Sequence, residues 1–139
     1  MKSLDKLNPL AKKIWLRLIT EYPDWESYFS SDERDDLEVA VPAPQGSNAG
    51  HLIISTAEGK DIWLRFSPPC MFYAIDDLDE MLAVIKSLLT EEVCMVAITE
   101  GDDWAETTLI ARGQKISLEP GQTAQFVSWS GSHDKILTA

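Results

Sequence analysis

One amphipathic helix separates two groups of strand-like segments, and this arrangement limits the folds that are open to the chain. The stretch DDLDEMLAVIKSLLTEE places apolar residues three and four positions apart, which is the spacing of one helix face. Asp77 is suited to cap this helix, and Glu80 has the spacing of a capping box. The apolar stripe comprises Leu78, Met81, Leu82, Ile85, Leu88 and Leu89.

Strand-like segments lie on both sides of this helix. Some alternate apolar and polar residues, which is typical of half-buried strands, and VCMVAIT is an apolar run typical of a buried strand. LEVAVPAP, HLIIST and DIWLRFS precede the helix, and VCMVAIT, WAETTLIAR and AQFVSWS follow it. Short turns such as AEGK and EGDD join them and favour antiparallel pairing. We therefore predict an α+β fold with an N-terminal helix, an antiparallel sheet of about five to six strands and one central crossover helix.

The N-terminal region is predicted to be helical. Asn8 is a favoured N-cap residue, and Pro9 suits the first position of a helix that Tyr22 and Pro23 would end. WESYF is a candidate for a short second helix. The chain has the size of one domain, so we expect a single domain, 1–139, with the helical segment 1–30 packed on it. Residues 131–139 either add an edge strand or form a loose tail.

Hydropathy argues against a membrane-spanning or secreted chain. Apolar runs fall far short of the roughly 20 residues that a membrane-spanning helix needs. The N-terminal stretch MKSLDKLNPLAKKIWLRLIT carries scattered charges in place of the continuous apolar region of a signal peptide. We therefore predict a cytoplasmic protein without a membrane partner.

The net charge of −11 is concentrated in two blocks. Residues 21–38 hold eight acidic residues against one arginine, and residues 76–106 hold ten against one lysine. This acidity disfavours nucleic acid as a partner, because nucleic-acid affinity depends on lysine and arginine at the phosphates. It favours a basic protein, whose encounter it would accelerate. The alternative reading is that the acidity only keeps the chain in solution.

No complete catalytic, cofactor or metal motif occurs in the sequence. The phosphate-binding patterns GxxxxGK[ST] and GxGxxG are absent, and SWSGSH lacks the glycine spacing of a GxSxG elbow. His51 and His133 have no evident nucleophile, and the acids of EGDDW lack calcium-loop spacing. We interpret Cys94 as a buried thiol, and the sequence does not indicate whether Cys70 is reactive. We expect no catalytic residues, no cofactor, no metal and no enzymatic activity.

Two sets of residues are candidates for binding a partner. Aromatic residues and arginine dominate the centres of protein interfaces, and Trp63 and Arg65 share the outward face of their strand. By the same alternation, Trp104 and Glu106 share a strand face. The alternative for both pairs is a tryptophan that covers the edge of the core. The full candidate set is Asp32, Asp35, Asp36, Asp102, Asp103, Trp104, Glu106, Trp63 and Arg65.

Residues 52–110 contain LIISTAEGKDIWLRF, the aromatic crossover, the long helix and GDDWAETTLI in this order. This succession resembles a group of small acidic immunity proteins from bacterial polymorphic and contact-dependent toxin systems. The resemblance implies a stoichiometric inhibitor that binds a cognate toxin. Many of those proteins have histidines in the crossover, where this chain has Met71, Phe72 and Tyr73, so no histidine-based role is carried over.

The sequence therefore favours a non-enzymatic inhibitor of a basic toxin, such as a nuclease, acting as a monomer or homodimer. The first alternative is a type III secretion chaperone for an effector, which would share the small size, the acidity and the α+β pattern. The second is a small-ligand binder or enzyme with a pocket beside residues 63–77.

Overall fold

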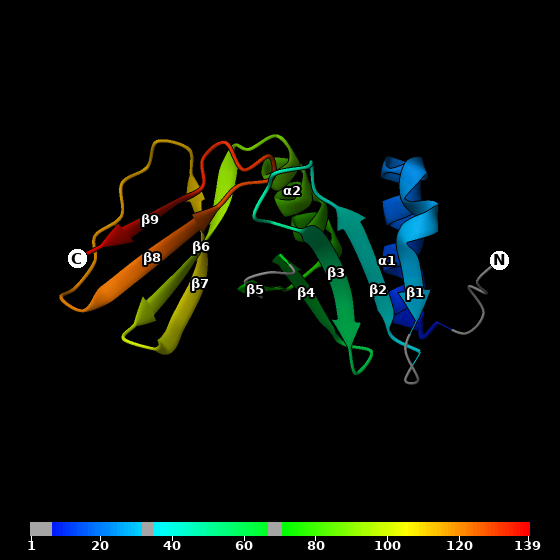
Figure 1. Ribbon diagram of the computed structural model, residues 1–139. Coiled ribbons are helices and arrows are strands. Elements are labelled where there is room, and N and C mark those ends of the chain that lie inside the picture. Colours follow the sequence, from blue (N-terminus) through cyan, green and yellow to red (C-terminus); the bar gives the residue numbers. More distant parts are fainter. Residues whose placement is uncertain (1–6, 32–34, 67–70) are drawn as a thin grey trace.

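The computed structural model describes residues 7–31, 35–66 and 71–139, and it shows an α+β fold (Figure 1). This confirms the predicted fold class. None of the helices in these ranges is long and apolar enough to cross a membrane. The elements are α1 Pro9–Glu21, the 3-10 helix η2 Pro23–Tyr28, β1 Phe29–Ser31, β2 Leu37–Pro42, β3 His51–Ala57, β4 Asp61–Phe66, β5 Met71–Ile75, α2 Leu78–Leu89, β6 Val93–Glu100, β7 Asp103–Ala111, β8 Gln122–Val127 and β9 Lys135–Thr138.

The strands form two antiparallel sheets rather than one. Sheet A has the order β1-β2-β3-β4-β5, and sheet B has the order β7-β6-β8-β9. The difference arises at the aromatic crossover, where 71–75 folds back onto β4 as strand β5. Helix α2 then carries the chain to β6, which begins a second sheet instead of extending the first.

Several local predictions are confirmed, and some gain detail. Asn8 caps α1 by accepting a hydrogen bond from the Ala11 backbone N–H at 2.9 Å. Asp77 caps α2 by accepting from the Glu80 N–H at 2.7 Å, while the Glu80 carboxylate accepts from the N–H of Asp76. The segment WESYF lies within a 3-10 helix and the start of β1. The C-terminal tail contains edge strand β9, so the edge-strand alternative is the one that holds.

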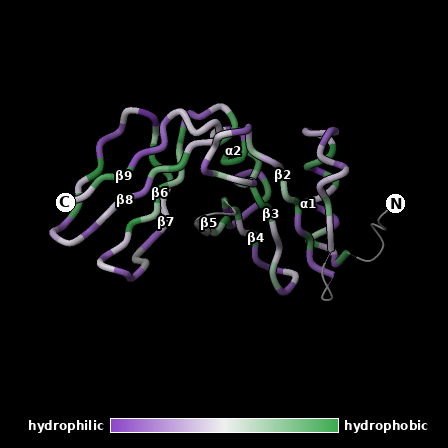
Figure 2. The backbone as a smooth tube through the Cα atoms, in the orientation of Figure 1, coloured by the Kyte–Doolittle hydropathy of each residue, from purple (hydrophilic) through white to green (hydrophobic). Residues whose placement is uncertain are grey.

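Both helices and one face of each sheet meet in the main hydrophobic core. Trp15 of α1, Leu64 of β4, Ile85 of α2 and Met95 of β6 all belong to this core. Figure 2 shows hydrophobic residues in the elements that meet at the middle of the molecule, whereas the tip of the β6–β7 hairpin is hydrophilic. The main core therefore joins the two sheets.

Strand β6 is buried on both of its faces, unlike a strand with one face in the core and the other in solvent. Met95 and Ala97 point into the main core, and Cys94, Val96 and Ile98 point into a second cluster on the outer face of sheet B. Ile116 and Leu118, from the loop after β7, pack against this second cluster. The run VCMVAI is continuously apolar because each of its two faces meets a different core.

Asp36 is the centre of a buried polar network that anchors the start of α1. Its carboxylate accepts hydrogen bonds from Asn8 Nδ2 at 2.8 Å and from the Thr56 hydroxyl at 3.0 Å. It also accepts from the backbone N–H groups of Glu58 and Gly59, at 3.0 and 3.2 Å. The network thus connects the N-cap of α1 to the β3–β4 hairpin.

This position corrects the interpretation of Asp36 as a partner-binding residue. Asp36 is only 3% exposed, so its carboxylate is not available to a partner. Burial by itself would raise the pKa of the Asp36 carboxyl, but the hydrogen bonds that it accepts outweigh burial and lower its pKa. The sequence showed the charge of SSDERDD but not the fold that turns this one aspartate inward.

We predict that Asp36→Ala lowers the free energy of unfolding by about 2–4 kcal/mol, because it leaves buried donors without an acceptor. The adjacent exposed Asp35, at φ 63°, provides the control. Asp35→Asn should change stability by no more than about 0.5 kcal/mol, since asparagine tolerates this backbone conformation. Equal effects of the two substitutions in urea unfolding would contradict the structural role of Asp36.

The same network predicts a pH dependence. A carboxyl group whose pKa is lowered by folding stabilises the protein above its unfolded pKa of about 4, and this contribution is lost as the pH falls through the folded-state value. The wild-type free energy of unfolding should therefore fall from about pH 5 downward more steeply than that of Asp36→Asn. Parallel curves over this range would show that Asp36 does not contribute.

Candidate functional site

The β6–β7 hairpin presents a group of four exposed acids. Glu100, Asp102 and Asp103 are exposed around a tight turn in which Gly101 has φ 63°. Glu106 is exposed further along β7. None of these four carboxylates forms an ion pair with a residue that the structure describes. The hairpin therefore carries four negative charges at the surface that no cation of the described residues pairs.

The register of this hairpin does not support the prediction that Trp104 and Glu106 share a strand face. A shift between Ile98 and Thr99 pairs Glu106 with Ile98, and Trp104 with Thr99. Because neighbouring residues of β6 face opposite sides, an irregularity here interrupts simple alternation along β7. The Trp104 side chain lies outside the described part of the structure, so only its backbone position on β7 is established.

Of the candidate acids at 32, 35 and 36, the structure describes two, and it places them differently. Asp35 is exposed, Asp36 is buried, and Asp32 lies outside the described residues. The Asp35 backbone carbonyl accepts a hydrogen bond from the Asn8 N–H at 3.0 Å, beside the start of α1. Within the described chain, Asp35 is therefore the one member of this predicted set that can meet a partner.

Trp63 and Arg65 lie, as predicted, on the face of sheet A opposite the main core. Ile62, Leu64 and Phe66 point into that core, and Trp63 and Arg65 alternate with them and are half-buried. The β3 residues opposite them are Ser55 and Ile53. Trp63 and Arg65 both make further contacts, so this face already has internal partners.

Some of the remaining residues of the aromatic segment lie in or against the main core, and others lie outside the described residues. Tyr73 is half-buried against the main core, and Ile75 is buried within it. Cys70 lies outside the described residues, and the Phe72 side chain is not described. None of residues 63–77 lines the cavity described next, so a ligand pocket beside that segment stays a prediction.

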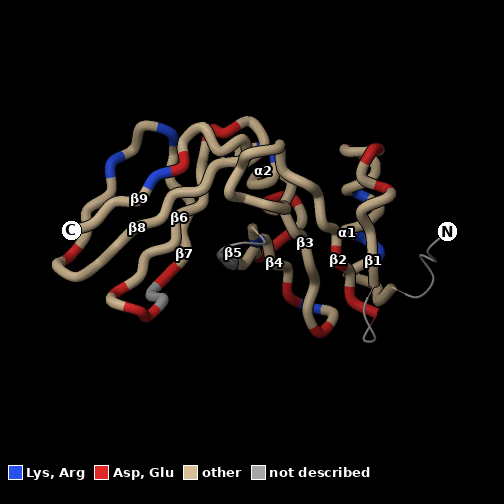
Figure 3. The backbone as a smooth tube through the Cα atoms, in the orientation of Figure 1, with Lys and Arg blue, Asp and Glu red and all other residues tan. Residues whose placement is uncertain are grey.

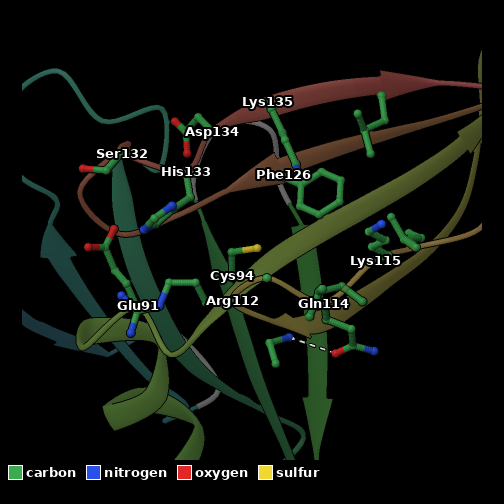
Figure 4. Close-up of a pocket in the computed structure, with 15 residues that line it drawn as sticks. Glu91, Cys94, Arg112, Gln114, Lys115, Phe126, Ser132, His133, Asp134 and Lys135 are labelled. Atoms are coloured by element: carbon green, nitrogen blue, oxygen red, sulfur yellow. Dashed lines mark hydrogen bonds between the residues drawn. The ribbon is translucent and has the colours of Figure 1, made fainter.

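That cavity lies on the outer face of sheet B and has a volume of about 670 Å³. Its apolar wall includes buried Cys94 and Phe126, which Figure 4 shows near the middle of the site. Lys135, from β9, places Nζ 4.7 Å from the centre of the Phe126 ring. The remaining walls are formed by Glu91, residues 110–116, residues 132–135 and Leu137.

Two acidic residues of the cavity hold its surrounding loops in place. Glu91, at φ 60°, accepts hydrogen bonds from the Ser130 hydroxyl at 2.6 Å and from the Ser130 N–H at 3.0 Å. The Ser130 hydroxyl is the main reason that the pKa of Glu91 is lowered. Asp134 accepts from the Ser128 N–H at 2.7 Å and, more weakly, from the Asn48 N–H at 3.4 Å. These contacts tie the α2–β6 turn and a loop of sheet A to the segment before β9.

The cluster of serine, histidine and aspartate in this segment is a loop-stabilising arrangement. Ser128 is fully buried, and its hydroxyl donates to Asp134 Oδ1 at 3.2 Å. The same hydroxyl accepts from the backbone N–H of His133 at 3.0 Å. The Ser128 hydroxyl is thus bonded to the backbone of His133. In the described ranges there is no group of three or more histidine, cysteine, aspartate or glutamate residues placed to hold a metal ion.

Three cations around the cavity were missed by motif-based reasoning. Arg112, Lys115 and Lys135 are exposed and form no ion pair with any described residue. They come from two segments far apart in the sequence, so no local pattern joins them. The available signal was the charge map, because residues 107–139 are slightly positive in a chain of net charge −11.

No protein-family model, no curated protein and no solved structure matches the chain.

We predict that Cys94 is a slowly reacting thiol. It is 9% exposed, and burial is the main cause that raises its pKa. The thiolate fraction at pH 8 is therefore smaller than that of a free cysteine, whose pKa is about 8.5. In a Cys70→Ser background, iodoacetamide should modify Cys94 at least roughly tenfold more slowly than the urea-unfolded chain at the same pH.

The pH profile gives a second readout of the same prediction. Intact-protein mass spectrometry should show that modification of Cys94 is still accelerating above pH 9, where a free thiol has levelled off. A native-state rate equal to the unfolded-state rate at pH 8 would show that the cavity wall does not protect this thiol.

Proposed function

We propose that this protein is a non-enzymatic binding protein that inhibits a basic protein toxin, with the β6–β7 hairpin as its main contact surface. The observation that carries the proposal is the group of exposed carboxylates at Glu100, Asp102, Asp103 and Glu106, which lack ion-pair partners among the described residues. Such a group offers charge that is available for lysine and arginine side chains of a partner.

The distribution of charge over the fold supports this choice of surface. Figure 3 shows acidic residues at the tips of the β6–β7 and β3–β4 hairpins and at the start of β2. All three places lie at the lower side of the molecule in this view. Basic residues gather instead on α1 and around the loop after β7. A charge distribution of this kind orients a basic partner during encounter and raises the association rate.

The tip of the hairpin is accessible to a partner. Strand β6 is paired with β8 as far as Glu100, so the hairpin is part of sheet B along its length, and its turn at Gly101 is exposed and hydrophilic. A nuclease must present a basic cleft to phosphates, so an acidic hairpin can occupy the same cleft. Asp102 and Asp103 would pair with the toxin's cations, and our proposal assigns Trp104 the apolar contact beside them.

The test is copurification of this chain with the product of the adjacent upstream gene, followed by titration calorimetry. We expect a one-to-one complex with sub-micromolar affinity, which Asp102→Asn plus Asp103→Asn weakens at least about tenfold by removing two charge-assisted contacts. The affinity of the wild-type chain should fall as salt is raised, and that of the double variant should fall less.

The matched control is Glu21→Gln plus Glu26→Gln, which removes two exposed acids beside the junction of α1 and η2. This variant should bind within about twofold of the wild type if the contact is local, because screening limits the reach of charges to roughly 10 Å. An equal loss in both double variants would show that only net charge matters. A stable homodimer that binds a secretion effector would favour the chaperone alternative.

A further inference from the structure

We propose that the cavity on the outer face of sheet B is a binding site for a small organic anion, a carboxylate attached to an apolar body. Two observations combine in this proposal. The wall of the cavity is apolar, and its rim carries cations that no described residue pairs. A ligand with one apolar part and one anionic part satisfies both.

The apolar wall is built by alternate residues of three strands. Cys94 on β6, Ile110 on β7 and Phe126 on β8 all belong to the second hydrophobic cluster, and Ile116 packs on it from the loop. The register pairs Leu137 of β9 with Ala124, which places it on the same face of the sheet. Leu137 is 36% exposed, so apolar surface remains available at the cavity.

The rim of the cavity carries positive charge, which is unexpected in so acidic a chain. The chain has 23 acidic residues, yet Arg112, Lys115 and Lys135 have no ion pair with any described residue. Glu91 and Asp134 also line the cavity, but their carboxylates accept hydrogen bonds from loop residues. Arg112 can meet a carboxylate with two parallel hydrogen bonds, and the lysines add point charges.

The volume fits the proposed class of ligand. Small-molecule sites commonly enclose about 300–1,000 Å³ and combine apolar walls with a few polar groups. At about 670 Å³ the cavity lies within this range. Along β6, Cys94 and the acidic turn are about 20 Å apart at 3.3 Å per residue, and along β7 the cavity residue Ile110 and Glu106 are about 13 Å apart. The anion site and the proposed toxin contact use different residues, and each can fail without the other.

The test uses three probes with the same apolar chain and different head groups. Titrations of the ¹⁵N-labelled full chain with octanoate, octanol and octylamine are followed by NMR. We expect octanoate to bind with a Kd below about 1 mM and to shift amides of Cys94, Gly113 and Phe126, because its carboxylate meets the rim cations. Octanol should bind at least about tenfold more weakly, and octylamine should not bind at these concentrations.

Matched variants locate the contact. Lys115→Gln and Arg112→Gln should each raise the octanoate Kd at least about threefold, whereas Lys13→Gln, an exposed lysine on α1, should leave it unchanged. Leu137→Ser should weaken binding, whereas Ile136→Ser should not. Ile136 is 66% exposed, but its neighbouring position on β9 puts it on the opposite face. All these positions are exposed. Thermal unfolding of each variant is the control that it is folded.

Different results would overturn different parts of the proposal. Octanol binding as tightly as octanoate would overturn the role of the cations. Equal effects of Leu137→Ser and Ile136→Ser would overturn the placement of the apolar chain. An octanoate Kd above about 10 mM, or shifts confined to residues outside the cavity, would overturn the proposal as a whole.

Discussion

The burial of β6 on both of its faces is the constraint on which the arrangement of the two sheets depends. Its inward residues Met95 and Ala97 complete the main core with the helices and sheet A, and its outward residues complete a second cluster. A strand of this kind cannot lie at the surface, so it needs cover on each side. Helix α2 and sheet A provide one cover, and the loop with Ile116 provides the other.

The two candidate sites lie at the opposite ends of this strand. At the end of β6 the chain turns at Gly101 and exposes carboxylates, where the sheet has passed beyond the main core. At the start of β6 the outer cluster opens into the cavity with its cationic rim. A strand fixed by two cores is a rigid support for both, which limits the conformational freedom lost on binding.

Polar networks hold the segments that hydrophobic burial leaves free. Asp36 joins the start of α1 to the β3–β4 hairpin, and Glu91 and Asp134 fix the loops beside the cavity. These acids belong to a chain whose acidity is an obvious feature, yet they serve the fold rather than a partner. Net charge alone therefore does not identify a binding residue. The hairpin acids differ from these three because they are exposed and because no described residue forms an ion pair with them.

The sequence by itself determined the α+β class, both helix starts and the strands β2, β3, β4, β6, β7 and β8, because local periodicity and capping at Asn8 and Asp77 act over a few residues. It also indicated the exposed acids of the β6–β7 turn. It did not indicate strand β1, or that 71–75 pairs with β4 as strand β5. Only the tertiary structure decided that there are two sheets, that Asp36 turns inward and that Arg112 and Lys135 meet at one cavity. Those features depend on contacts between residues far apart in the chain, which no local pattern encodes.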